Sequence, residues 1–267
     1  MGSPVDLHSL RELALDAAGQ AAVLLVDKRP DRVDVAATKS SPTDVVTEMD
    51  RSAERLIVNL IKETRPDDSV LGEEGSADTG TTRVRWLVDP IDGTVNYLYG
   101  LPGWSVSIGI EVDGDLAVGV VAVPTFGETY TAVLGEGAYR DDERIRCNLP
   151  PDLGYALAGT GFGYEVARRA HQADVVRGLL PRVRDIRRFG SCAADLCAVA
   201  GGRLDAYYER GPQPWDLAAG VLIAREAGAR VEGLRGSPPS ADMVLAAPPG
   251  LFETIHDLLV ELDADRD

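Results

Sequence analysis

The first sixty residues show the hydrophobic spacing of helices. Apolar side chains recur every three or four positions over about 6–28, which predicts a helix that ends before Pro30. A polar stretch over 39–44 precedes a second predicted helix over about 51–63. This second helix places five apolar residues on one face, namely Ala53, Leu56, Ile57, Leu60 and Ile61.

Beyond the second helix the apolar runs become shorter, which is typical of strands. Residues 69–71 form a short apolar run, and 85–89 has the pattern of a buried strand. Three later segments alternate or run apolar between turn residues, and Asp113-Gly114 is a good hairpin turn. An antiparallel meander is therefore expected over 104–112, 116–123 and 128–134.

After Pro150-Pro151 the chain alternates between strand and helix patterns. The prolines separate an N-terminal lobe, about 1–149, from a C-terminal lobe, about 150–267, and we expect both to belong to one domain over 1–267. A mixed α/β or α+β protein in several layers follows. Strands are expected near 155–160, 184–188, 204–208 and 243–247, and helices near 165–179, 191–200, 215–227 and 250–262.

Composition and charge narrow the classes of function. Apolar residues make up 45% of the 267 residues, which is enough for a sizeable core and excludes disorder along the whole chain. The net charge of −16 argues against a surface that binds nucleic acid or an anionic membrane, because phosphates require a basic patch. This charge fits a protein whose acidic groups hold cations, and it fits mere solubility equally well.

The sequence also indicates the cellular compartment in which the protein is expected. No apolar stretch approaches the roughly 18 residues of a membrane span, and the N-terminus lacks the basic and apolar regions of a signal peptide. Three cysteines cannot all pair within one chain, and none has C-x-x-C spacing, so a reducing cytoplasm is expected. The cysteines are Cys147, Cys192 and Cys197.

Several motifs that suggest other chemistry fail on spacing. Gly159-Thr-Gly161-Phe-Gly163 follows a predicted strand, but the dinucleotide-binding pattern requires glycine where Tyr164 stands, so a strand-end turn is the better interpretation. Asp89-Pro-Ile-Asp92 resembles the start of an EF-hand loop, but the position of its final acidic ligand is Gly100. The histidines lie on predicted helices far from any nucleophile pattern, which disfavours a histidine triad or zinc site: His8, His171 and His256.

The most informative segment is Asp89-Pro-Ile-Asp92-Gly-Thr94, directly after a predicted strand. The extended turn imposed by Pro90 can direct both carboxylates and the Ile91 carbonyl at one point. Two carboxylates about 4 Å apart repel by roughly 4 kcal/mol at an effective dielectric of 20, so both stay ionised only beside a cation. Oxygen ligands favour magnesium, manganese or calcium, and the amides of Gly93 and Thr94 at a helix start can bind phosphate. The plainer alternative is a loop-to-helix turn capped by Asp92.

Three other acidic segments each have a plainer alternative. Gly72-Glu73-Glu74 follows a short apolar strand and is, on its own, typical of a solvated turn. Trp215-Asp216 opens a predicted helix after two prolines, where an acid favours the positive end of the helix dipole. Thr47-Glu-Met-Asp50 matches a capping box before an apolar helix.

Five separated motifs, any one of which is weak, occur together in this chain. They are Lys39-Ser-Ser-Pro-Thr-Asp44-Val-Val-Thr47-Glu-Met-Asp50, Gly72-Glu73-Glu74, Asp89-Pro-Ile-Asp92-Gly-Thr94-Val-Asn96, Gly190-Ser191 and Trp215-Asp216-Leu-Ala-Ala-Gly220. In order and spacing they resemble the motif set of the inositol monophosphatase family, over nearly the whole chain. The resemblance implies a layered αβαβα sandwich of the inositol monophosphatase and fructose-1,6-bisphosphatase type, commonly a homodimer.

The resemblance further implies a site for two or three Mg²⁺ ions, for which Mn²⁺ can substitute. Glu73, Asp89 and the Ile91 carbonyl match the ligands of a first metal. Asp89, Asp92 and Asp216 match those of a second, and Glu73 also matches the ligand of a third, weaker one. Members of the family are often inhibited by lithium.

Catalytic and substrate-binding roles are implied in the same way. Thr94 and Asp50 match the pair that orients and activates the attacking water, and Glu73 belongs to the catalytic set. Gly93 and Thr94 match the residues whose amides hold the phosphate. The remaining substrate-binding residues implied are Ser191, Cys192, Ala193 and Asp216, together with Glu209, which matches the acid that meets sugar-ring hydroxyls.

The implied activity is hydrolysis of a small polyol phosphate, foremost myo-inositol monophosphate, by metal-activated water. Cys192 replaces an alanine of the usual pattern, and Tyr99 stands where several members have histidine or arginine, which leaves the leaving-group preference open. Fructose 1,6-bisphosphate and histidinol phosphate are alternative substrates within the same fold, and the lack of a long insertion argues mildly against nucleotide phosphates. A non-enzymatic alternative is a protein-partner regulator in RNA processing or transcription.

Overall fold

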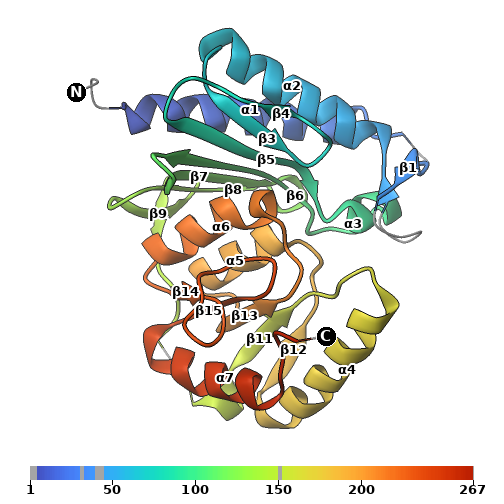
Figure 1. Ribbon diagram of the computed structural model, residues 1–267, viewed down its shortest axis with the longest axis vertical. Coiled ribbons are helices and arrows are strands. Elements are labelled where there is room, and N and C mark those ends of the chain that lie inside the picture. The colour runs from blue at the N-terminus through green and yellow to red at the C-terminus, as the bar shows by residue number, and fades with distance from the viewer. Residues whose placement is uncertain (1–4, 31–32, 40–44, 150–151, 267) are drawn as a thin grey trace.

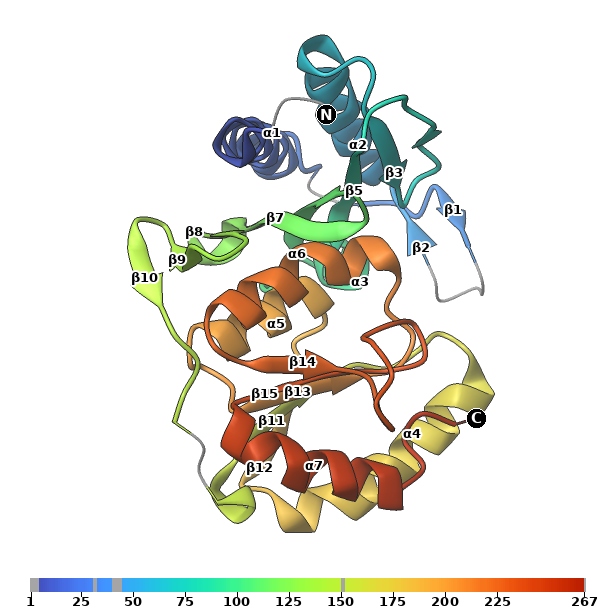
Figure 2. The same ribbon diagram turned by 60° about the vertical axis from the view of Figure 1, so that its left-hand side comes forward.

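The computed structural model describes residues 5–30, 33–39, 45–149 and 152–266. Its elements form five layers, in the order helix, sheet, helix, sheet, helix, and two views of the molecule agree on this arrangement (Figures 1 and 2). The predicted αβαβα sandwich is confirmed. Most of the polar stretch over 39–44, and the predicted lobe boundary at Pro150-Pro151, lie outside the described residues.

Two helices, α1 (Leu7–Asp27) and α2 (Glu48–Thr64), form the outer layer over the larger sheet (Figure 1). Both confirm the predictions, but α2 begins three residues earlier than expected. Its cap explains this difference, because Thr47 and Asp50 form the reciprocal bonds of a capping box. The apolar face of α2 is directed inward, and Ala53, Ile57 and Ile61 are fully buried.

The larger sheet has eight strands in the order β10-β9-β8-β7-β6-β5-β3-β4. Its meander from β6 to β8 is antiparallel, as predicted, whereas β3 and β5 are parallel. Asp113 and Gly114 both have positive φ, as a tight hairpin turn requires. The bounds are β3 (Ser69–Gly72), β4 (Ala77–Asp78), β5 (Val84–Asp92), β6 (Ser105–Val112), β7 (Asp115–Val123), β8 (Glu128–Val133), β9 (Gly137–Arg140) and β10 (Glu143–Ile145).

The prediction for β5 was wrong at its end. The strand does not stop before Pro90, because its pairing with β6 shifts register after Asp89 and resumes at Asp92, opposite Ser105. Strands β9 and β10, and the two-residue strands β1 (Ala37–Thr38), β2 (Val45–Val46) and β4, were not predicted. A six-residue helix, α3 (Thr94–Tyr99), follows β5 immediately.

The smaller sheet has five strands in the order β12-β11-β13-β15-β14. Strand β11 is parallel to β12 and β13, whereas β15 runs antiparallel to both of its neighbours. Its strands are β11 (Leu157–Thr160), β12 (Asp185–Arg187), β13 (Ala206–Glu209), β14 (Arg230–Glu232) and β15 (Val244–Ala247), of which only β14 was not predicted. The helices α4 (Val166–Leu179) and α7 (Pro249–Glu261) cover its outer face (Figure 2).

The two sheets enclose a central layer of two helices, α5 (Cys192–Ala200) and α6 (Pro214–Glu226). Eight consecutive residues of α6, from Leu217 to Ala224, are buried, and the helix packs against strands of both sheets. A bond of 3.1 Å from the Ser107 hydroxyl to the Trp215 carbonyl joins the first turn of α6 to β6. On this ground we propose that the two lobes form a single domain. Across the described part of the chain no helix is long and apolar enough to span a membrane.

Candidate active site

A cavity opens where the end of β5 meets the first turn of α6 and the end of β13. Five acids from three elements and one turn line it, namely Glu73, Asp89, Asp92, Glu209 and Asp216. The two that lie farthest apart in the sequence, Glu73 and Asp216, are separated by 143 positions. Nine of the predicted site residues lie on its wall, namely Glu73, Asp89, Ile91, Asp92, Gly93, Thr94, Cys192, Glu209 and Asp216. The other three, Asp50, Ser191 and Ala193, lie behind the wall and bond to residues on it.

Asp89 and Asp216 lie close to other acids of the cavity. Burial raises the pKa of Asp89 above its ordinary range, and the nearby charges of Glu73, Asp92 and Asp216 raise it further. Burial, followed by the charges of Asp92 and Glu73, likewise raises the pKa of Asp216. One Asp216 oxygen accepts the Gln213 amide at 2.7 Å, which caps α6, and the plainer interpretation of this acid as a helix-end residue is therefore also correct.

Asp92 is held by the start of α5. Its Oδ2 atom accepts bonds from the Ser191 hydroxyl at 2.7 Å and the Ala193 amide at 2.6 Å. Burial still raises the pKa of Asp92 to about 6, because these bonds do not fully offset the loss of solvent. Asp92 does not cap α3, since Gly93 occupies that position and α3 has no side-chain cap. The alternative of a merely capped turn is therefore wrong.

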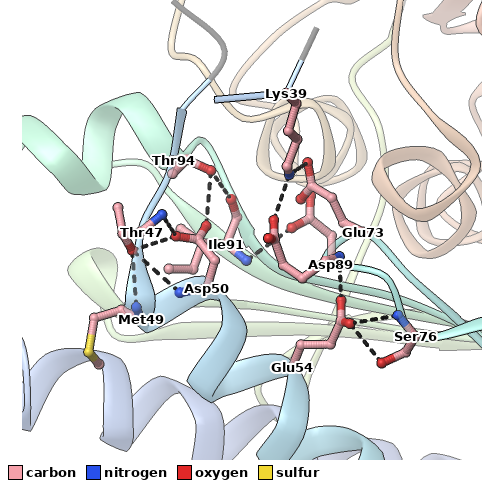
Figure 3. Close-up of polar contacts among 11 residues, drawn as sticks. Lys39, Thr47, Met49, Asp50, Glu54, Glu73, Ser76, Asp89, Ile91 and Thr94 are labelled. Atoms are coloured by element: carbon pink, nitrogen blue, oxygen red, sulfur yellow. Dashed lines mark hydrogen bonds and ion pairs between the residues drawn. The ribbon is translucent and has the colours of Figure 1, made fainter. Parts of the chain in front are cut away.

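Thr94 and Asp50 meet across the cavity wall (Figure 3). The Thr94 hydroxyl lies 3.2 Å from Asp50 Oδ1 and 3.0 Å from the Ile91 carbonyl oxygen. The other oxygen of Asp50 accepts bonds from the Thr47 amide at 2.7 Å and the Thr47 hydroxyl at 2.5 Å. Burial raises the pKa of Asp50 in spite of these bonds. The capping box thus orients a carboxylate whose second oxygen faces Thr94.

Lys39 approaches the acidic cluster from the end of β1 (Figure 3). Its ammonium lies 2.7 Å from a Glu73 oxygen and 2.5 Å from a Glu74 oxygen. Glu54 on α2 secures the same turn from behind, because it accepts the amides of Glu74 at 2.7 Å and Ser76 at 3.0 Å. The Gly72-Glu73-Glu74 turn is therefore a buried, bonded structure rather than the solvated turn of the plainer interpretation.

Glu209, at the end of β13, also lines the cavity. Its carboxylate accepts the Tyr207 hydroxyl and lies against Gly161, where an added Cβ would stand 2.0 Å from it. Burial raises the pKa of Glu209 to about 7, although the Tyr207 bond opposes this shift. The glycine-rich segment 159–163 is a strand-end turn, as expected, but its lack of a side chain at Gly161 gives Glu209 its place.

The donor set fits a hard divalent cation. Glu73, Asp89, Asp92 and Asp216 offer only oxygen atoms, and the Ile91 carbonyl lies on the same wall. Burial and the charges of neighbouring acids raise the pKa values of Asp89, Asp92 and Asp216, and a bound cation would offset this repulsion. These residues would hold Mg²⁺ or Mn²⁺ in preference to zinc or copper.

Some residues of the site carried no signal in the sequence. Phe162, Tyr164 and Arg188 line the cavity, and Glu54 supports the turn that carries Glu73. Phe162 and Tyr164 follow the end of β11, and Arg188 follows β12, so the pairing of these strands is what brings them to the cavity. Sequence spacing alone could not reveal a pairing between segments so far apart.

The layered fold and the acid-lined cavity together define a class of proteins, and comparison with known proteins identifies that class. The model of the inositol monophosphatase family matches residues 6–264, and the chain belongs to this family. Membership supports a phosphatase activity.

Individual relatives agree with this assignment. The Mycobacterium tuberculosis protein named inositol-1-monophosphatase SuhB is 46% identical, over 94% of this chain and 92% of that protein. A Pasteurella multocida relative named Nus factor SuhB is 39% identical, over 94% of this chain and 96% of the relative. Among solved structures, an IMPase from Thermotoga maritima superposes with a TM-score of 0.86 at 31% identity, covering 94% of this chain and 97% of that one.

Proposed function

We propose that this protein is a magnesium-dependent phosphoric monoester hydrolase that acts on a small polyol phosphate, foremost myo-inositol monophosphate. One observation carries the proposal. A cluster of four acids, of which Asp89 and Asp92 are buried, shares a cavity with the start of α3, which offers backbone amides, and with Glu209, which offers an acceptor for hydroxyl groups. The acids and the amides suit a cation and a phosphate, and Glu209 suits a polyol.

Different residues around the cavity have different roles in hydrolysis. Gly93 is in the left-handed conformation, with φ of +94°, and opens α3 so that the amides at its start face a bound phosphate. Thr94 Oγ1 and Asp50 Oδ1 lie close enough to orient one water molecule between them for in-line attack. The Asp50 carboxylate can accept a proton through Thr94, since its other oxygen is fixed by Thr47.

Glu73, Asp89, the Ile91 carbonyl, Asp92 and Asp216 would hold two or three metal ions. When bound, these ions supply Lewis-acid charge for the water nucleophile and the leaving oxygen. Ser191 and Ala193 keep Asp92 in place, and Cys192 lines the wall beside it. The Glu209 carboxylate, held by Tyr207, accepts hydrogen bonds from the hydroxyl groups of the leaving alcohol.

The choice of substrate rests on Glu209 and on the relatives. One solved relative, 27% identical with a TM-score of 0.75, is a Staphylococcus aureus protein described as inositol monophosphate bound. Fructose 1,6-bisphosphate and histidinol phosphate remain the alternative substrates. We propose in addition a cytoplasmic homodimer that millimolar lithium inhibits.

Release of inorganic phosphate tests the metal-dependent activity directly. Activity on myo-inositol 1-phosphate should vanish in excess EDTA and return on addition of Mg²⁺, because four acids repel a phosphate unless cations balance them. The same assay with added lithium chloride tests the inhibition. Full activity in EDTA would overturn the metal mechanism.

A second candidate function is favoured by the names of several relatives. Proteins of Pasteurella multocida and Vibrio cholerae that are 39% and 35% identical are named Nus factor SuhB. A role as a protein partner in transcription would therefore suit this chain, whereas its charge of −16 disfavours direct contact with nucleic acid. A chain with this role alone would release no phosphate from any member of a panel of inositol, sugar and histidinol phosphates.

A further inference from the structure

One charged side chain of the cavity has no part in the chemistry described above. Arg188 lies between β12 and α5 and lines the cavity together with Glu209 and Cys192. Along the wall, as far as the described residues form it, Arg188 is the single residue with a positive charge. The net charge of the wall is otherwise negative, so this arginine changes what the cavity can bind.

The guanidinium of Arg188 is close to the start of α3. It packs against Gly190, where an added Cβ would lie 2.5 Å from Arg188 Nη1. The Gly190 carbonyl oxygen in turn lies 2.9 Å from the position of a Cβ on Gly93. Gly190 therefore lies between Arg188 and Gly93, one of the residues whose amides are proposed to hold phosphate.

Arg188 differs from its neighbour Arg187 in its partners. Arg187 forms an ion pair with Asp185 at 2.5 Å and donates to the Ile186 carbonyl at 2.9 Å. Within the described part of the chain, Arg188 forms no hydrogen bond or close ion pair. It acts at longer range, where its charge opposes the burial that raises the pKa values of Glu209 and Asp195. Its planar donors are thus available to a ligand in the cavity.

We propose that Arg188 is a specificity-determining residue that donates hydrogen bonds to oxygen atoms of the same leaving alcohol that Glu209 binds. A carboxylate accepts from hydroxyl groups and a guanidinium donates to them, so the pair suits an alcohol that carries several hydroxyls. The positive charge of Arg188 also disfavours a leaving group that is itself cationic. The substrate class is therefore neutral polyol phosphates rather than amino-alcohol phosphates such as histidinol phosphate. This inference rests on the proposed phosphatase function.

The test compares three substrates in the magnesium-loaded, full-length enzyme. These are myo-inositol 1-phosphate, histidinol phosphate and 4-nitrophenyl phosphate, whose leaving group has no hydroxyl substituents. In Arg188→Gln, kcat/KM for inositol phosphate relative to nitrophenyl phosphate should fall by roughly tenfold or more, the effect of a lost charged hydrogen bond. The same ratio for histidinol phosphate should stay unchanged or rise.

Two further variants make the result specific. Arg187→Gln removes an equal charge one position away and should leave both ratios unchanged. Arg188→Lys keeps the charge without the planar fork, so it should retain the bias against histidinol phosphate and recover part of the loss on inositol phosphate. The melting temperature of each variant checks its folding.

The outcomes separate this inference from the proposed function. If the wild type hydrolyses none of the three substrates, the proposed function fails, and the role of Arg188 fails with it. If the wild type is active and Arg188→Gln loses equally on all three substrates, or loses on none, only the inference is overturned.

Discussion

Asp68 and the two acids on β5 are all buried in the N-terminal lobe, but their surroundings differ. Asp68, just before β3, is 1% exposed and accepts bonds from three side chains. Arg65 donates twice, at 2.6 and 3.0 Å, while Thr82 donates at 2.7 Å and the Trp86 indole at 3.0 Å. Burial alone would raise the pKa of Asp68, but these bonds outweigh it, and the pKa lies below its ordinary value.

Asp89 and Asp92, on β5, are also buried, but their pKa values are raised. Their nearest charged neighbours are other acids, and no arginine or lysine among the described residues forms an ion pair with either one. An acid surrounded by donors stabilises the fold, whereas acids that face each other store repulsion that a cation relieves. The contrast distinguishes an acid that stabilises the fold from the acids for which we propose a metal-binding role, without reference to any motif.

The largest effect is expected of Asp92→Asn, which tests the comparison between Asp68 and the acids on β5. We expect kcat to fall by roughly a thousandfold or more. Asparagine keeps the oxygen that accepts from Ser191 and Ala193, so the fold should persist. Because one repelling charge is removed, the variant should melt in EDTA at a temperature no lower than the wild type. Phosphate release and thermal melts measure both effects.

The control for this variant is Asp115→Asn, on the exposed β6–β7 hairpin. It should change neither kcat nor the melting temperature in EDTA. A near-wild-type kcat in Asp92→Asn would exclude Asp92 from the chemistry. A large drop in melting temperature in EDTA would place Asp92 with Asp68, among the structural acids.

A smaller effect on activity is expected when Glu209, the proposed acceptor for the polyol, is changed. Glu209→Gln should lower kcat/KM for inositol phosphate by roughly ten- to a hundredfold, because a neutral amide accepts hydroxyl bonds more weakly than a carboxylate, by about 1.5–3 kcal/mol. An aryl phosphate has no ring hydroxyls and should lose far less. Equal losses on the two substrates would assign Glu209 to metal support or folding instead.

Local signals predicted much of this structure. The spacing of apolar residues predicted α1 and α2, and the capping box and the Asp113-Gly114 turn were visible as short motifs. The acids of the cavity could be proposed because each follows a strand or opens a helix, and because five motifs agreed. What the motifs could not show is how each carboxylate is bonded.

The features that were not predicted depend on contacts between distant segments. Glu54 is 3% exposed although it lies on a polar position of α2, because its partners are Glu74 and Ser76. Strand β5 continues past Pro90 only because β6 pairs with it again at Asp92.

The smallest effect on activity is expected of Asp68→Asn, which should lower stability without lowering the activity of the folded enzyme. An amide can accept through one oxygen only, so its nitrogen would face the donors of Arg65 or Trp86. We expect a loss of about 1.5–3 kcal/mol in the free energy of unfolding at pH 7. Urea unfolding measures it, with Asp67→Asn, an exposed neighbour, as the control.

The pH dependence of this loss distinguishes an ionic effect from a change in packing. The pKa of Asp68 is lowered in the folded state, so its stabilising contribution is complete above the unfolded pKa of about 3.9 and disappears as the pH falls through the lower folded value. The difference between wild type and Asp68→Asn should therefore be constant from pH 7 to about 5 and shrink below about 4. A difference of the same size at pH 3 would mean that Asp68 acts through shape alone. In that case the hydrogen-bond donors around Asp68 would not explain how it differs from the acids of the cavity.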